Sequence, residues 1–252
     1  ITSGPFIMTM GINATSHWQS GYFVVSMAMG ILSVIFLFTK DMWEGISASS
    51  RVEDHDENNA SLCETIKSIQ ALLSVALFFL YTGVELGLGL WIYSLLTESR
   101  GVAPEVAGIV TGGYWAMFTV GRIFAGWYAK KIDVRKLIYL SISLALFGVA
   151  LLLADSSQII TILGVTLTGF AIAPIFPGLV SSTTSRVGFR HQANTIGMQI
   201  AAAGLGVAVV PSIAGVLARI FGLEVIPLYL LSTLALLLLI FIISNSHSGE
   251  YT

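Results

Sequence analysis

The sequence contains few charged residues and almost no cysteine. Only 10% of its 252 residues are charged, against roughly 25% in an ordinary soluble domain. So few charges cannot cover the water-facing surface of a soluble protein of this size. The 12 Lys and Arg residues form no clustered basic face of the kind that binds nucleic acid. The single cysteine, Cys63, excludes an intramolecular disulfide and a cysteine-rich zinc site.

The start of the sequence also lacks the features of a signal peptide. It begins at Ile1 without a methionine, and no charged segment precedes an apolar stretch. We therefore expect the chain to be a fragment of a longer protein.

Apolar residues are abundant, at 55% of the sequence. A spanning helix needs about 20 mainly apolar residues. A window of that length selects seven stretches, at 21–39, 69–96, 105–129, 137–154, 158–180, 193–219 and 225–243. The sequence therefore predicts an all-α, polytopic membrane helix bundle with seven transmembrane helices, surrounded by membrane lipid.

The distribution of Lys and Arg predicts the orientation, because short cytoplasmic loops carry the excess of these residues. One side of the predicted bundle collects nine of them, and the other holds only Arg100 and Arg219. This asymmetry predicts that residues 1–18 lie outside and that the tail 244–252 is cytoplasmic, in a plasma membrane or a bacterial inner membrane. The longest polar insert, 40–68, carries an acidic run and is expected to be a flexible connector.

Two ionisable side chains fall well within the predicted spans, Glu85 and Arg122. A charge at the bilayer centre costs about 2.5–3.5 kcal/mol, so such residues usually have a function. With a rise of 1.5 Å per residue, their depths differ by about 13 Å, which is too far for direct pairing. Glu85 is therefore a candidate proton carrier. The alternatives are a protonated glutamic acid that hydrogen-bonds between helices, or a partner in a missing part of the protein.

The helix around Glu85 is rich in glycine, and one of its faces is polar. Tyr81, Thr82, Glu85 and Gly89 share that face at i, i+3 and i+4 spacing, which makes them candidates for the wall of a substrate cavity. The alternative is that Gly83 and Gly87 allow a neighbouring helix to approach closely.

Proline and glycine interrupt the fifth predicted span. Spans two to four and five to seven form two triplets of opposite orientation, led by the second and the fifth span. Interrupted segments at corresponding positions of inverted repeats indicate a transporter's binding site, although membrane helices also tolerate proline and glycine. The candidate helix-break and gating residues are Gly169, Pro174, Pro177 and Gly178.

Two further groups of residues are functional candidates. Tyr114 and Trp115 in the third span and Thr195 and Gln199 in the sixth could face a hydroxylated solute, because rings stack on sugars and amides donate and accept hydrogen bonds; helix packing is the alternative. Residues at the cytoplasmic end of the third span could form a conformational latch or a plain positive anchor. The latch candidates are Arg122, Gly126, Lys130, Lys131 and Asp133.

The run from Gly121 to Lys136 resembles the cytoplasmic-loop motif that the major facilitator superfamily carries between its eighth and ninth helices. Lys130 occupies the acidic position of that motif. The segment 81–85 with Trp91, together with 173–178, is similar to the fucose permease-like group of the superfamily.

The resemblance implies a division of the chain into four parts. Residues 1–39 would be the end of helix five and helix six, 40–68 the central loop, 69–243 the C-terminal half with two inverted three-helix repeats, and 244–252 the tail. It also implies alternating-access transport of a sugar with a proton, without a cofactor, in which the missing N-terminal half takes part. Ser3-Gly4-Pro5 resembles the end of an antiporter motif, so proton-coupled efflux of drugs or metabolites is the alternative.

Two other classes of protein share some of these features. A seven-helix receptor has the same number of spans, but residues 225–243 contain no lysine and the sequence contains no Asn-Pro pair. A membrane enzyme would need clustered histidines and carboxylates. The four histidines, His17, His55, His191 and His247, all fall in predicted loops or tails, so we expect neither an enzyme nor a metal site.

Overall fold

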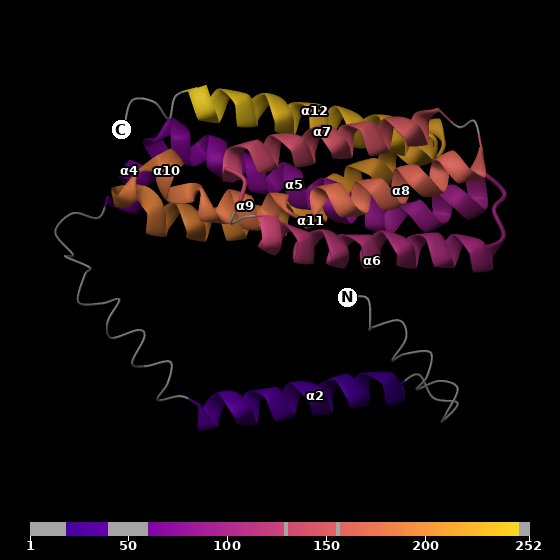
Figure 1. The fold of residues 1–252 in the computed structure, drawn as a ribbon, viewed down its shortest axis with the longest axis horizontal. Coiled ribbons are helices and arrows are strands. Elements are labelled where there is room, and N and C mark those ends of the chain that lie inside the picture. The colour runs from indigo at the N-terminus through magenta and orange to yellow at the C-terminus, as the bar shows by residue number, and fades with distance from the viewer. Residues whose placement is uncertain (1–18, 40–59, 129–130, 155–156, 247–252) are drawn as a thin grey trace. The chain divides into compact units, whose positions relative to one another are not determined.

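The computed structural model describes residues 19–39, 60–128, 131–154 and 157–246, and all regular structure in these residues is helical (Figure 1). The chain divides into two compact units, 1–59 and 60–252. The first contains α2 (Gln19–Phe38), an apolar helix of 20 residues that matches the first predicted span. Two of the predicted functional features, Lys130 and the segment Ser3–Pro5, lie outside the described residues.

The second unit contains the remaining helices. They are α4 (Leu62–Lys67), α5 (Ile69–Ser94), a π-helical turn (Leu95–Ser99), α6 (Pro104–Tyr128), α7 (Val134–Leu153), α8 (Gln158–Ile172), α9 (Ile175–Ser181), α10 (Thr183–Val187), a 3-10 turn (Phe189–His191), α11 (Gln192–Phe221) and α12 (Val225–Ser246). Six helical segments among the described residues are long and apolar enough to cross a membrane. The third predicted span forms α6, which is 25 residues long but is not among those six, because five glycines and Arg122 dilute its apolar residues.

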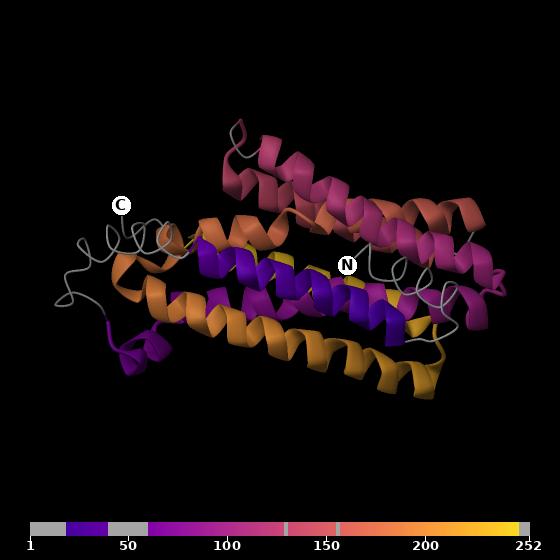
Figure 2. The ribbon, with the colours of Figure 1, turned by 90° about the horizontal axis from the view of Figure 1, so that it is seen from below.

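The long helices of the second unit pack in two groups of three. Helix α5 packs mainly against α11 and α12, whereas α8 packs mainly against α6 and α7. Figure 2 shows the two groups as separate layers, joined by contacts of α12 with α7 and of α5 with α6 and α9. In sequence order, the leading helix of each triplet thus packs against the second and third helices of the other triplet.

Glycines allow the closest of these helix contacts. A methyl group in place of the Gly206 hydrogen in α11 would collide with the Phe79 carbonyl oxygen of α5 and lie 2.6 Å from the Thr82 hydroxyl. Gly169 in α8 has the same relation to the Tyr114 carbonyl oxygen of α6. The backbones therefore pack with almost no side chain between them, as small residues permit in membrane helices.

Residues 60–68, which the sequence places in the connector, form an ordered part of the second unit. Ser61 and Glu64 make a capping box at the start of α4, which satisfies two helix-terminal donors. The Thr65 hydroxyl lies 3.1 Å from His191 Nδ1, and Asn194 Nδ2 donates to the Ala60 carbonyl oxygen at 2.8 Å. These contacts attach α4 to the start of α11.

An arginine joins the connections at the predicted outer end of the second unit. Arg100 follows α5, and its guanidinium binds both carboxylate oxygens of Glu224, with Nη2 2.7 Å from Oε2 and Nε 2.9 Å from Oε1. It also donates to the Thr161 hydroxyl at the start of α8 and to the Leu152 carbonyl oxygen at the end of α7. One side chain, 7% exposed, therefore links three connections, those between α5 and α6, between α7 and α8, and between α11 and α12.

Replacing Arg100 with Gln is expected to destabilise the folded protein. Charge-assisted hydrogen bonds contribute more than neutral ones, but the Glu224 side chain is 45% exposed, so solvent screens the pair. We expect a loss of about 2 kcal/mol in the free energy of unfolding, measured by thermal unfolding in detergent. Arg219→Gln, an exposed basic residue in the last turn of α11, is the matched control, and equal effects of the two substitutions would contradict the prediction.

The same ion pair predicts a pH dependence. Hydrogen bonds from Arg100 hold the pKa of Glu224 below its ordinary value. The stabilisation is therefore fully present above the unfolded pKa of about 4.3, and it is lost as the pH falls through the lower pKa of the folded state. Glu224→Gln should flatten the stability profile in that acidic window, and an unchanged profile would exclude this contribution.

Candidate functional site

Glu85 lies in the interior of the second unit, where α5 meets the interrupted helix of the fifth predicted span. Its side chain is only 7% exposed. One turn earlier on α5, the ring of Tyr81 lies 6.0 Å from the ring of Phe176 in α9, and Phe78 lies 5.2 Å from the same ring. The face of α5 that carries the acid therefore packs against the segment that follows the helix break.

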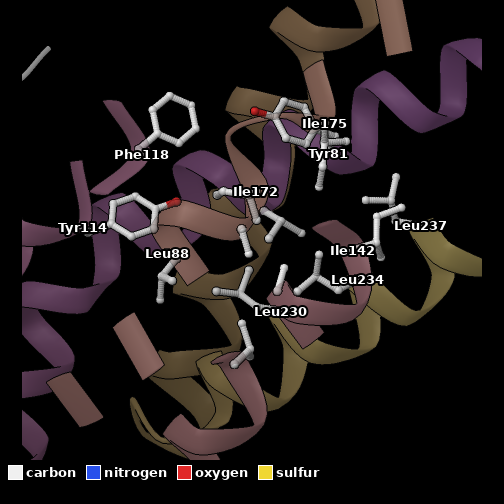
Figure 3. Close-up of a cluster of buried hydrophobic side chains, with 14 of the residues drawn as sticks. Tyr81, Leu88, Tyr114, Phe118, Ile142, Ile172, Ile175, Leu230, Leu234 and Leu237 are labelled. Atoms are coloured by element: carbon white, nitrogen blue, oxygen red, sulfur yellow. The ribbon is translucent and has the colours of Figure 1, made fainter. Parts of the chain in front are cut away.

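The groups around Glu85 come from α5 and α6. The Tyr81 hydroxyl and the Arg122 guanidinium are electrostatic neighbours of the carboxyl, and the buried Tyr81 hydroxyl has no hydrogen-bond partner among the described residues. In Figure 3 this hydroxyl points toward the side of the cluster that carries Phe118 and Tyr114. Within the described ranges, Glu85 forms no ion pair. The guanidinium of Arg122 instead stacks on Phe118, with its carbon 4.4 Å from the ring centre.

The interruption of the fifth span occurs at Pro174. Helix α8 ends at Ile172, Pro174 caps the start of α9, and Pro177 lies in its first turn. The break follows from the missing backbone N–H of proline and from its clash with the preceding turn. Gly178 packs against Ile138 of α7, and a methyl group there would lie 2.9 Å from that side chain. A gating role for Gly169, Pro174, Pro177 and Gly178 remains a prediction.

Several of the residues predicted to line a solute cavity are buried between helices of the second unit, and their role in a cavity stays a prediction. Tyr114, Thr195 and Gln199 are fully enclosed by the helices of the second unit. The Tyr114 hydroxyl donates to the Glu85 carbonyl oxygen at 2.8 Å, and Gln199 Nε2 donates to Ser74 at 2.6 Å and to Thr183 at 3.1 Å. The Tyr114 and Gln199 side chains thus hold helices together, as buried polar groups in an apolar bundle usually do, whereas the buried Thr195 hydroxyl has no hydrogen-bond partner among the described residues.

The remaining cavity candidates also make helix contacts. The Thr82 hydroxyl donates to the Ala203 carbonyl oxygen of α11 at 2.9 Å. Gly89 gives room for the Trp115 ring, which would meet a methyl group at that position. Gly83 and Gly87 face two different helices, meeting Val210 of α11 and Leu230 of α12. Of these candidates, Gly89 and Trp115 are the ones that stay partly exposed.

The described latch candidates do not pair with one another. The Asp133 carboxylate caps α7 and accepts from the backbone N–H of Lys136 at 3.3 Å. Lys131 lies over the Trp127 ring, 4.9 Å from its centre, and Gly126 has open space beside it. The acid of this segment is therefore used as a helix cap, and a latch formed with Arg122 would need a partner from outside the described residues.

Sequence reasoning missed the burial of Arg186, which it counted as a loop residue. This side chain is 1% exposed; Nη2 donates to the Leu179 carbonyl oxygen at 2.6 Å and Nε to that of Ser182 at 3.3 Å. A cation at a helix C-terminus is stabilised by the helix dipole. Burial lowers the pKa of Arg186 to about 10, so it stays charged at neutral pH. No local pattern distinguishes it from an exposed positive residue.

The described residues contain no group of three or more His, Cys, Asp or Glu side chains that could hold a metal ion.

Comparison with known proteins gives a consistent set of relatives. The family model of the Major Facilitator Superfamily matches residues 72–250. The chain is 26% identical to "Bypass of stop codon protein 6" of Saccharomyces cerevisiae over 84% of its length and 48% of that protein. It is 28% identical to the human "Sodium-dependent glucose transporter 1" over 78% of its length and 37% of that protein. It is 25% identical to the "Glucose/mannose transporter GlcP" of Bacillus subtilis over 59% of its length and 36% of that protein. The chain therefore spans half or less of the length of these relatives.

Proposed function

Because the chain belongs to the Major Facilitator Superfamily, we propose that it is the C-terminal half, with the preceding helix, of a secondary active transporter. The transporter moves a small polar solute, a sugar or a related metabolite, by proton-coupled alternating access. The missing N-terminal half completes the solute passage. A seven-helix receptor, the alternative from another class, does not agree with membership of this family.

The packing of the long helices supports the assignment to two inverted three-helix repeats. Helices α5, α6 and α7 form one repeat, and the interrupted helix α8–α9 with α11 and α12 forms the other. Each leading helix packs against the second and third helices of the other repeat. The two repeats therefore contact each other in equivalent ways. Leading helices of such repeats border the binding site near the midplane, so we infer that α5 and the break at Pro174 lie beside the solute passage.

The solute class rests on the relatives and on the sequence motifs. Two of the relatives are named as glucose or glucose/mannose transporters. The segments 81–85 and 173–178 are similar to the fucose permease-like group, whose members carry sugars with protons. The structure brings these two segments together through the contact of Tyr81 with Phe176.

Proton coupling rests on one observation. Glu85 is buried where α5 contacts the broken helix, and it forms no ion pair with any described residue. A carboxyl that sits between helices and lacks a fixed cation can gain and lose a proton when those helices separate. The Arg122 charge acts on this carboxyl from α6 without pairing with it.

The proposal predicts uptake driven by a pH gradient. The full-length protein in proteoliposomes should accumulate one or more hexoses when the outside is acidic. Each pH unit is worth about 1.4 kcal/mol, which is a tenfold concentration ratio for one coupled proton. A sodium gradient, applied alone, tests the coupling ion that the human relative's name states. Export of lipophilic cations under the same pH gradient, without hexose uptake, would establish the efflux alternative instead.

A further inference from the structure

A cavity of about 410 Å³ lies where α6, the start of α7 and α9 meet. This volume falls in the range of small-molecule sites. Its walls come from the helix break at Pro174, from Phe176 and Gly178, and from Val134 and Leu137 of α7. Of the side chains that line it, only Arg122 and Ser181 are polar. The cavity is therefore an apolar chamber with one cation on its wall.

A second cavity, of about 310 Å³, continues the first one toward the outer surface of the bundle. The two share Ala125, Leu137 and Pro174 in their walls. The second cavity lies between α6, α7 and α8, and two of its lining side chains, Phe124 and Leu140, are 40% and 60% exposed. These exposed apolar side chains open the second cavity at the surface of the second unit, so the pair of cavities leads from that surface to Arg122.

The chemistry of these walls excludes a hydroxylated solute as the occupant. A sugar needs several hydrogen-bond donors and acceptors around it, and these cavities offer few. Arg122 is exposed and makes neither a hydrogen bond nor an ion pair with any other described residue; its contact is the Phe118 ring. A guanidinium is well suited to bind phosphate with two parallel hydrogen bonds. The complementary ligand is an amphipathic anion with an apolar chain.

We propose that this pair of cavities binds one anionic phospholipid, with its phosphate at Arg122 and an acyl chain between α6 and α7. The site lies toward the end of α6 that the sequence predicts to be cytoplasmic, where Lys131 and the basic residues that follow it favour anionic lipids. Because α9 forms one wall, the bound lipid contacts the segment just after the helix break. The site lies beside the proposed solute passage, because Pro174 and Phe176 border both, but it does not depend on the identity of the solute.

Native mass spectrometry of the full-length protein in detergent tests this proposal. Delipidated protein is titrated with dioleoylphosphatidylglycerol or dioleoylphosphatidylcholine. The wild type should bind one phosphatidylglycerol about tenfold more tightly than phosphatidylcholine, because both lipids carry the phosphate but the choline cation of phosphatidylcholine is repelled by Arg122 and the neighbouring basic residues. Arg122→Gln should remove this preference, whereas Arg219→Gln should retain it.

A second pair of variants tests the apolar part of the site while keeping Arg122. A methyl group at Gly126 or at Gly108 would meet no atom within 4 Å, so the helix can accept a side chain at both positions. Gly126 lines the larger cavity and Gly108 lines neither. Gly126→Leu should therefore lose phosphatidylglycerol binding, and Gly108→Leu, on the same helix, should keep it.

Three results would overturn the proposal. The first is unchanged phosphatidylglycerol binding in both Arg122→Gln and Gly126→Leu. The second is that inorganic phosphate protects the protein from thermal unfolding as strongly as phosphatidylglycerol does, which would indicate a simple anion site. The third is displacement of the lipid by the transported solute, which would make the cavities part of the solute site. Failure of hexose transport leaves the lipid measurement unaffected, so the two proposals fail separately.

Discussion

Replacing Glu85 with Gln is expected to abolish proton-driven accumulation of the solute. Gln keeps the size and the hydrogen-bonding capacity of the side chain, but it cannot carry a proton. Under a pH gradient of one unit, the concentration ratio across the membrane should fall from about ten to about one. The measurement is the steady-state uptake of labelled solute by proteoliposomes of the full-length protein. Exchange of labelled for unlabelled solute at equal pH should persist, because it needs no net proton movement.

The matched control is Glu105→Gln. Glu105 is an exposed glutamate in the first turn of α6, away from the α5–α9 contact. The Glu105→Gln variant should transport the solute like the wild type. If Glu85→Gln still accumulates solute against the gradient, then Glu85 is a structural hydrogen-bonding group and the coupling residue lies elsewhere, for example in the N-terminal half.

Replacing Gly206 with Ala is expected to have the largest effect on stability of any single-methyl change in the second unit. The added methyl group would meet the Phe79 carbonyl oxygen and the Thr82 hydroxyl of α5. The carbonyl belongs to the helix backbone and cannot rotate away, so α5 and α11 have to separate. Overpacking of this kind costs about 1–3 kcal/mol, and we expect the upper part of that range. Thermal unfolding of the purified full-length protein measures the loss.

Gly204→Ala is the control for this substitution. It lies on the same helix, is exposed, and a methyl group there would meet no atom within 4 Å. Because alanine favours a helix over glycine by about 1 kcal/mol, the control should be as stable as the wild type or slightly more stable. Equal destabilisation by both changes would mean that the close approach of α5 and α11 is not the cause.

The long helices could be predicted from the sequence because their signal is local. Each predicted span corresponds to a helix or a pair of helices, and ends differ by a few residues, as for 137–154 against Val134–Leu153. A distortion at Pro174 was also predictable, since proline removes a backbone donor and clashes with the preceding turn, although α11 continues through Pro211. The capping box of Ser61 and Glu64 was readable as well, but its short helix was missed inside the polar insert.

The partners of individual side chains could not be predicted in the same way. Arg100 and Glu224 are 124 positions apart, and nothing in either segment indicates the other. Tyr114 lies at a position where the sequence predicts a cavity residue, yet its hydroxyl donates to a backbone carbonyl oxygen of α5. Arg186 has the sequence of a loop cation, yet it is buried. In each case the outcome depends on which helices become neighbours, and local sequence patterns do not show that.

The packing of each leading helix against the other repeat has a consequence for biogenesis. Helix α5 is synthesised before its main partners, which begin only at Gln192 and Val225. At about 5–20 residues per second, the ribosome needs on the order of ten seconds to deliver them. During this interval Glu85 and the polar groups near it are not yet buried by α11 and α12. We therefore expect the nascent chain to depend on an insertase or a membrane chaperone that retains α5 until α11 and α12 arrive.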